Sequence, residues 1–136
     1  MSYIPSVRLN SLTGGKGLLE KRVQLHELYD QYAPLLSPKQ RSFFELYYSE
    51  DLSLGEISEQ CRISRQAVYD HIRRAEELLH AYEEALQLNR RKRIRLELLR
   101  EGARLLSLSP TPREALLSVL LELEQLERTG REAHGV

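Results

Sequence analysis

A run of basic and amide side chains between Ser64 and Arg74 has the chemistry that nucleic-acid recognition requires. Arg65 can form a bidentate pair with guanine, and Gln66 can form one with adenine. Ser64, at the start of a helix, could meet a phosphate together with the free N–H groups of the first turn. Arg73 and Arg74 could contact phosphates, which supply affinity without sequence choice.

Two helices joined by a tight turn would hold these side chains. Ser53 is a favourable helix N-cap, and Glu56 lies three residues later, as in a capping box. Residues 60–63 are expected to form a short turn, after which Ser64 caps a second helix. The spacing predicts a helix-turn-helix, whose second helix would reach base edges in the major groove.

The apolar spacing in this stretch predicts which positions face inward. The expected inward residues are Leu54, Ile57, Ile63, Val68 and Ile72. The outer face then carries the candidate nucleic-acid-binding residues, which are Ser64, Arg65, Gln66, Tyr69, Asp70, Arg73 and Arg74. Asp70 would repel phosphate, so the alternative interpretation is a helical hairpin whose arginines are simply solvated.

A second basic patch lies further along the chain. It consists of Arg90, Arg91, Lys92, Arg93 and Arg95, with no acidic residue among them. The patch could bind phosphates of RNA or DNA, or it could be a solvated helix face. The whole chain carries 20 Lys and Arg against 20 Asp and Glu, so the overall basic excess that would favour nucleic acid is missing.

The rest of the sequence predicts an all-α fold with a long helix after the turn and additional C-terminal helices. We expect residues 1–17 to be a disordered extension, residues 18–90 to form the helix-turn-helix domain and residues 91–136 to form a C-terminal helical region. Ser37 and Pro38 mark the start of one further helix. No Gly or Pro interrupts residues 65–101, and a break follows at residues 109–112.

Leucine is abundant in the C-terminal region. Thr111 would cap a last helix, whose expected apolar face is Leu116, Leu117, Leu120, Leu121, Leu123 and Leu126. An apolar seam also follows the turn, from Val68 to Leu86. This is more apolar surface than one small module needs, so we expect a homodimer, with an intramolecular bundle as the alternative.

The aromatic run from Phe43 to Tyr48 has two interpretations. It could be a stacking platform for single-stranded RNA. Such a stripe at helical spacing is far more often part of a hydrophobic core, which is the interpretation that we favour.

The sequence offers no sign of an enzyme, a metal site or a cofactor. The four histidines lack metal-ligand spacing with one another and with Cys61. No nucleophile–base pair is recognisable, and residues 14–17 lack the spacing and the preceding strand of a phosphate loop. A single cysteine and the absence of a long apolar run predict a cytoplasmic protein.

The stretch from Tyr32 to Leu86 resembles the YlxM (p13) family of bacterial helix-turn-helix proteins. The phrases LLSPKQ, ELYY, DLSLGEI and SRQAVYD carry the resemblance, in this order. The helix-turn-helix itself is similar to region 4 of sigma factors, where a related pattern reads promoter DNA. His71 stands where the family usually has Asn. The resemblance implies a regulatory role in the signal recognition particle pathway, with the particle's RNA, its GTPase or its receptor as ligand.

Three functions are therefore open. The first is a regulatory protein of the signal recognition particle pathway that binds nucleic acid or a pathway protein. The second is a sequence-specific DNA-binding transcriptional regulator. The third is an adaptor that binds only protein, because a helix-turn-helix alone does not fix function.

Overall fold

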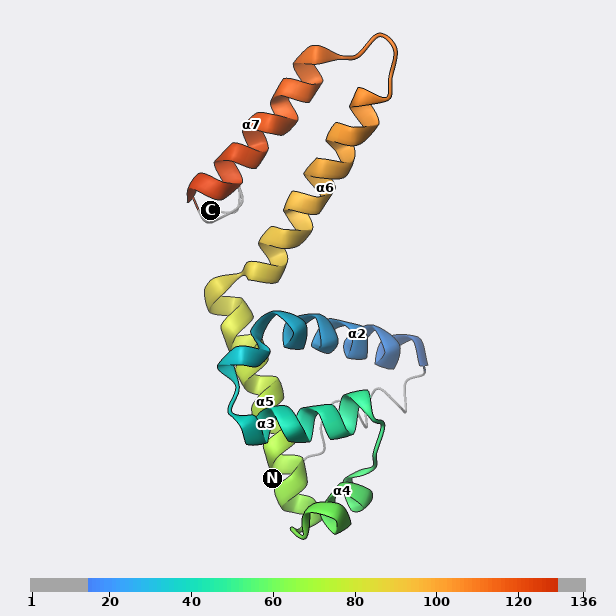
Figure 1. Cartoon of the computed structure of the whole chain (residues 1–136), viewed down its shortest axis with the longest axis vertical. Helices are drawn as coiled ribbons and strands as arrows, with labels where there is room; N and C mark the ends of the chain where they lie inside the picture. Colours follow the sequence, from blue (N-terminus) through green and yellow to red (C-terminus); the bar gives the residue numbers. More distant parts are fainter. Residues whose placement is uncertain (1–14, 130–136) are drawn as a thin grey trace. The chain divides into compact units, whose positions relative to one another are not determined.

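The computed structural model describes residues 15–129 and contains six α-helices and no strand in that range, which confirms the all-α fold (Figure 1). The helices are α2 (Gly15–Tyr32), α3 (Pro38–Phe44), α4 (Leu54–Cys61), α5 (Arg65–Leu86), α6 (Leu88–Leu106) and α7 (Arg113–Thr129). A short 3-10 turn (Ala33–Leu35) follows α2, and one π-helical turn (Glu45–Ser49) extends α3.

The chain forms two compact units, which divide between Ala85 and Leu86. The division expected from the sequence lay between residues 90 and 91. The long helix ends at Leu86 because Gln87 adopts a left-handed conformation, with φ 56° and ψ 31°, which a right-handed helix cannot contain. The helix α6 then begins directly at Leu88.

The expected N-terminal extension lies mostly outside the described residues. Residues 1–14 are not described, and α2 already begins at Gly15. The last three residues of the expected extension, 15–17, are therefore helical.

The first unit is built around an aromatic core. Phe43, Phe44 and Tyr48 are buried, so the aromatic run is core, as expected, rather than a stacking surface. The ring of Tyr29 on α2 stacks on Phe44 with 4.5 Å between centroids. His71 on α5 stacks in the same way on Phe43, at 4.6 Å. Helices α2, α3 and α5 thus share one core.

Hydrogen bonds fasten the two ends of this core. Ser37 caps α3 and Pro38 occupies its first turn, as the sequence predicts, and Gln40 completes a capping box that was not predicted. The Tyr32 hydroxyl donates to the Glu83 carboxylate at 2.6 Å, and the Tyr82 hydroxyl donates to the Leu35 carbonyl at 3.2 Å. These bonds hold the second half of α5 against the end of α2 and the turn that follows it.

The second unit is an antiparallel hairpin of α6 and α7 (Figure 1). The break between the helices lies where the sequence predicts it, although the Thr111 hydroxyl donates back to the Leu108 carbonyl instead of capping α7. The predicted apolar face of α7 is partly wrong. Val119 and Leu126 are buried, whereas Leu117, Leu120 and Leu121 are exposed, because a single partner helix covers only one narrow stripe.

Candidate nucleic-acid interface

The helix-turn-helix is made by helices α4 and α5 and the turn between them. The Ser53 hydroxyl accepts from the Glu56 N–H, and the Glu56 carboxylate accepts from the Ser53 N–H, which completes the predicted capping box. Ile57 is fully buried at the centre of α4. The cap fixes the start of α4 and the buried side chain fixes which face packs inward.

The turn is closed by a residue in the left-handed conformation. Arg62 has φ 60° and ψ 45°, and its N–H donates to the Ser58 carbonyl. The Ile63 N–H donates to the same carbonyl at 3.2 Å. The Ile63 bond is the six-to-one bond of a Schellman motif, and the Arg62 bond is the five-to-one bond of the simpler αL motif. Ser64 then caps α5, because its hydroxyl accepts from the Ala67 N–H at 3.0 Å. The turn is therefore as short as the sequence predicts.

The predicted outer face of α5 is largely exposed. Six of the seven predicted residues lie on the surface, namely Ser64, Arg65, Gln66, Asp70, Arg73 and Arg74. Val68 and Ile72 are buried on the opposite side, as expected. The first turn of α5 thus presents one guanidinium and one amide to solvent.

Tyr69 is the exception, and its placement on the outer face is wrong. Only 4% of its surface is exposed. Tyr69 lies three residues before Ile72, which places it on the inward face, and α5 buries a stripe wide enough to include both Val68 and Tyr69. A tyrosine ring in this position contributes to the core and cannot reach a base.

Arg65 lies over the backbone of α4. A Cβ atom added at Gly55 would come within 2.9 Å of an Arg65 terminal nitrogen and within 3.1 Å of the carbon at the centre of the guanidinium. The guanidinium therefore rests where a side chain at position 55 would project. Gly55 is a residue of the site that sequence reasoning missed, although a glycine inside a helix is itself an unusual signal.

Acidic side chains partly neutralise the outer face. The Gln66 amide donates to the Asp70 carboxylate at 2.9 Å, and Arg73 and Arg74 lie 3.2 Å and 3.8 Å from Glu77. Residues 53–77 carry four arginines and five acidic residues. Sequence reasoning missed Glu77, whose three- and four-residue spacing from the two arginines was the available signal.

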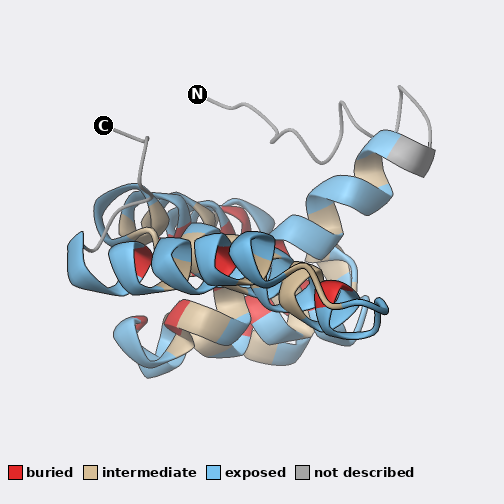
Figure 2. Cartoon of the chain, turned by 90° about the horizontal axis from the view of Figure 1, so that it is seen from above, coloured by how far each residue is buried: buried red, intermediate tan, exposed pale blue. Residues whose placement is uncertain are grey.

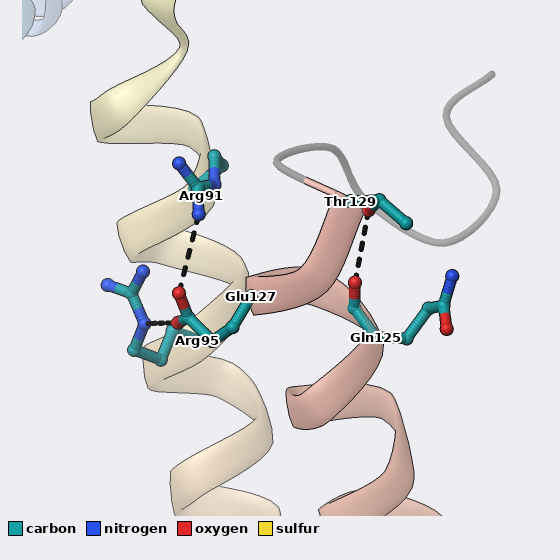
Figure 3. A network of polar contacts seen from close by, with 5 residues as sticks. All are labelled: Arg91, Arg95, Gln125, Glu127 and Thr129. Atoms are coloured by element: carbon teal, nitrogen blue, oxygen red, sulfur yellow. Dashed lines mark hydrogen bonds and ion pairs between the residues drawn. The ribbon is translucent and has the colours of Figure 1, made fainter.

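Only part of the second basic patch takes part in contacts between the two helices of the hairpin. Arg91 and Arg95 on α6 both pair with Glu127 on α7, at 3.3 Å and 2.6 Å, as Figure 3 shows. Arg90, Lys92 and Arg93 remain exposed on the same helix. Two of the five predicted residues therefore join the two helices, and three face solvent.

A partly buried polar network runs from Glu76 to the surface of the first unit at Asp51. The Tyr48 hydroxyl donates to Glu76 in a short hydrogen bond, and Arg22 donates to the Tyr48 carbonyl at 3.0 Å and to Asp51 at 2.7 Å. Burial raises the pKa of the Glu76 carboxyl, and the Tyr48 hydrogen bond opposes part of that rise. Burial raises the pKa of the Tyr48 phenol too, and the Glu76 charge adds to the effect.

Neither a metal site nor a membrane span is seen between residues 15 and 129. No three His, Cys, Asp or Glu side chains gather there in a way that could hold a metal ion. No helix in the same range is long and apolar enough to cross a membrane.

The capped pair of helices and its short turn define a helix-turn-helix protein. Residues 19–109 match the family model described as "Putative helix-turn-helix protein, YlxM / p13 like". The chain belongs to this family, UPF0122, as the sequence resemblance predicts.

Curated relatives of the same family cover most of the chain. A UPF0122 protein of Anoxybacillus flavithermus is 44% identical over 110 residues, which is 81% of this chain and all of that protein. A relative in Geobacillus kaustophilus has the same identity and coverage. One in Oceanobacillus iheyensis is 51% identical over 82 residues, or 60% of this chain and 78% of its own length.

Proposed function

We propose that this protein is a cytoplasmic regulator that binds nucleic acid through the N-terminal half of α5 and acts in the signal recognition particle pathway. The observation that carries the proposal is the first turn of α5, where Arg65 and Gln66 are exposed next to the capping Ser64. An arginine and an amide side by side on the second helix of a helix-turn-helix suit base edges. The resemblance to the YlxM family supplies the pathway.

The proposed interface consists of five side chains. Ser64, Arg65 and Gln66 would meet bases and the nearest phosphate. Arg73 and Arg74, about two turns further along α5, would contact the nucleic-acid backbone. Asp70 lies inside this surface and would weaken phosphate binding. Because its carboxylate accepts a hydrogen bond from Gln66, base contact would require Gln66 to turn away from it.

The balance of charge favours a ligand that is recognised by more than electrostatic attraction. Acidic residues equal or exceed arginines in this segment, so the counterion-release contribution to affinity is small. A structured RNA such as that of the signal recognition particle offers shape and unpaired bases besides phosphates. We therefore propose RNA rather than promoter DNA as the first ligand to test.

The test compares duplex DNA with the RNA of the signal recognition particle by fluorescence anisotropy over a series of salt concentrations. Wild type should bind the RNA, with affinity falling linearly against salt on a double-logarithmic plot. Arg65→Ala should lose about tenfold in affinity, and Arg73→Ala should lower the salt slope by about one. Arg128→Ala, an exposed arginine of α7 that carries the same charge, is the control.

Each outcome decides between the three functions. Tighter binding to duplex DNA than to RNA would favour the transcriptional regulator. The absence of binding to either ligand at low salt would overturn the proposal and favour a protein-binding adaptor. If wild type binds but Arg65→Ala and Arg73→Ala bind equally well, the ligand contacts a different surface. The next residues to test would then be Arg90, Lys92 and Arg93, the exposed part of the second basic patch.

A further inference from the structure

Helix α7 carries two apolar faces, of which α6 covers one. The covered face contains Val119 and Leu126, which are 6% and 1% exposed. The uncovered face contains Leu117, Leu120 and Leu121, each 54% to 55% exposed. In a hairpin of two helices the partner helix does not cover such a second face, and three half-exposed leucines in one turn are costly to leave in water.

Helix α6 has a matching uncovered stripe. Leu105 is buried against α7, whereas Leu96, Leu99 and Leu106 are 37%, 50% and 62% exposed. With the exposed Ala103 between them, these positions follow steps of three, four and three residues, which is the spacing of a helix–helix seam. In Figure 2 the buried positions appear as short bands between longer exposed and intermediate stretches.

The two stripes open on the same side of the hairpin. At 3.6 residues per turn, each stripe lies about 120° around its helix axis from the covered face, in the same rotational sense along the chain. Because α6 and α7 run in opposite directions, equal rotations of this kind bring the stripes to one side. We call this surface the leucine face, formed by Leu96, Leu99, Leu106, Leu117, Leu120 and Leu121.

The leucine face is large enough for a specific interface. A helix of 17 residues is about 25 Å long, and two helices side by side are about 20 Å wide. The footprint of the hairpin on this side is therefore roughly 500 Å², and two such footprints in contact would bury about 1,000 Å², which is about the minimum for a specific protein–protein interface. A contiguous exposed apolar patch of a few hundred Å² is often functional.

The charges around the face complement those of a second copy. Helix α6 carries seven basic and two acidic residues, and α7 carries two basic and four acidic residues. A two-fold axis parallel to the helices would place α6 of one copy on α7 of the other, antiparallel, so that basic and acidic helices pair. The product is a four-helix bundle in which neighbouring helices alternate in direction.

The register within one hairpin indicates which residues would meet. Arg91 and Arg95 lie level with Glu127, and Gly102 lies level with Val119 and Leu116. A rotation about this axis does not shift any residue along the helix direction, so residues that are level within one hairpin stay level between the copies. Leu99 would therefore meet Leu121 of the second copy. Lys92 continues the α6 stripe one turn before Leu96, and Glu124 continues the α7 stripe at the height of Leu96, about 6 Å further along the helix axis. The long Lys92 and Glu124 side chains can span this offset. These two residues would form an ion pair between the copies.

We infer that the leucine face binds the same face of a second copy of this chain and forms an antiparallel four-helix bundle. Sedimentation equilibrium of the full chain at micromolar concentration should give twice the monomer mass of 15.8 kDa. The double variant Leu117→Glu, Leu121→Glu should sediment as a monomer with an unchanged circular dichroism spectrum. Leu19→Glu, at an equally exposed leucine of α2, should remain a dimer.

A charge exchange tests the register separately. Lys92→Glu and Glu124→Lys should each weaken self-association by placing like charges together in the dimer. An equimolar mixture of the two variants should dimerise again, because both ion pairs are restored in the mixed dimer. A monomeric wild type would overturn the inference, as would dimers that persist in the leucine double variant. Failure of the mixture to dimerise would exclude the proposed antiparallel register.

Discussion

At the scale of single residues, the outer face of α5 is set by neighbours that have no ligand-binding chemistry of their own. Gly55 leaves room for the Arg65 guanidinium, and Glu77 holds Arg73 and Arg74. Surface ion pairs of this kind contribute little to stability, so the proposed effect of Glu77 is on the charge that a ligand would meet.

Gly55→Ala should separate stability from binding. A Cβ atom would displace the far end of the flexible Arg65 side chain and leave the backbone in place. Alanine is favoured over glycine in a helix by roughly 0.5–1 kcal/mol, so thermal stability should be kept or raised. RNA affinity, measured by anisotropy, should fall toward that of Arg65→Ala. Unchanged affinity would show that the resting place of Arg65 on α4 is irrelevant to binding.

Glu76 gives the first unit a dependence on pH. Its carboxyl pKa is raised above the ordinary value of 4.5, so the folded state holds the proton more tightly than the unfolded state. The contribution of Glu76 to stability is therefore fully present below pH 4.5 and is lost as the pH rises from there through the raised pKa. Each unit by which the folded-state pKa is raised lowers the free energy of unfolding at neutral pH by about 1.4 kcal/mol.

Glu76→Gln should remove this dependence, because the amide oxygen can still accept from the Tyr48 hydroxyl. Thermal unfolding should show the variant to be more stable than wild type at pH 7, with the difference shrinking toward pH 4. Glu84→Gln, at an exposed position of the same helix, should change little at either pH. An equal difference at pH 4 and pH 7 would exclude titration of Glu76 as the cause.

At the scale of elements, the local signals in the sequence located the starts of α3, α4 and α5. Both capping boxes and the turn after α4 are present because short-range hydrogen bonds decide them. The buried position of Tyr69 and the half-covered face of α7 were not predictable in this way. Each depends on how wide a stripe the packed neighbours cover, and the spacing of apolar residues in one helix does not contain that information.

The cap of α4 should carry measurable stability. Ser53→Ala removes the acceptor for the Glu56 N–H and should cost about 1 kcal/mol of unfolding free energy in a urea titration. Ser42→Ala is the control, because it replaces an exposed serine inside α3 with a better helix former. Equal midpoints for the two variants would mean that the capping box contributes nothing to the stability of the unit.

At the scale of the whole molecule, the two units differ in charge and in exposed apolar surface, although the net charge of the chain is zero. The first unit contains the helix-turn-helix and carries the proposed nucleic-acid interface. The second unit carries the surplus apolar surface and most of the charge asymmetry, with a basic α6 and an acidic α7. Composition summed over the chain therefore predicts neither the proposed ligand nor the proposed self-association.

Selective weakening of the hairpin tests whether the two units unfold independently. Glu127→Gln removes the common acceptor of Arg91 and Arg95 and should lower the melting temperature of the α6–α7 hairpin only. Glu122→Gln, at an exposed position of the same helix, should leave it unchanged. A parallel fall in the transition of the first unit would show that the chain unfolds as one cooperative body.

The division between Ala85 and Leu86 also determines which spectroscopic signals each unit gives. All seven tyrosines and both phenylalanines precede it, and the chain has no tryptophan. The hairpin is therefore silent in near-ultraviolet absorbance and in intrinsic fluorescence, although it contributes fully to the far-ultraviolet helical signal. Tyrosine emission follows the helix-turn-helix unit alone, and the remainder of the far-ultraviolet melt belongs to the hairpin, so the two units can be observed separately without any label.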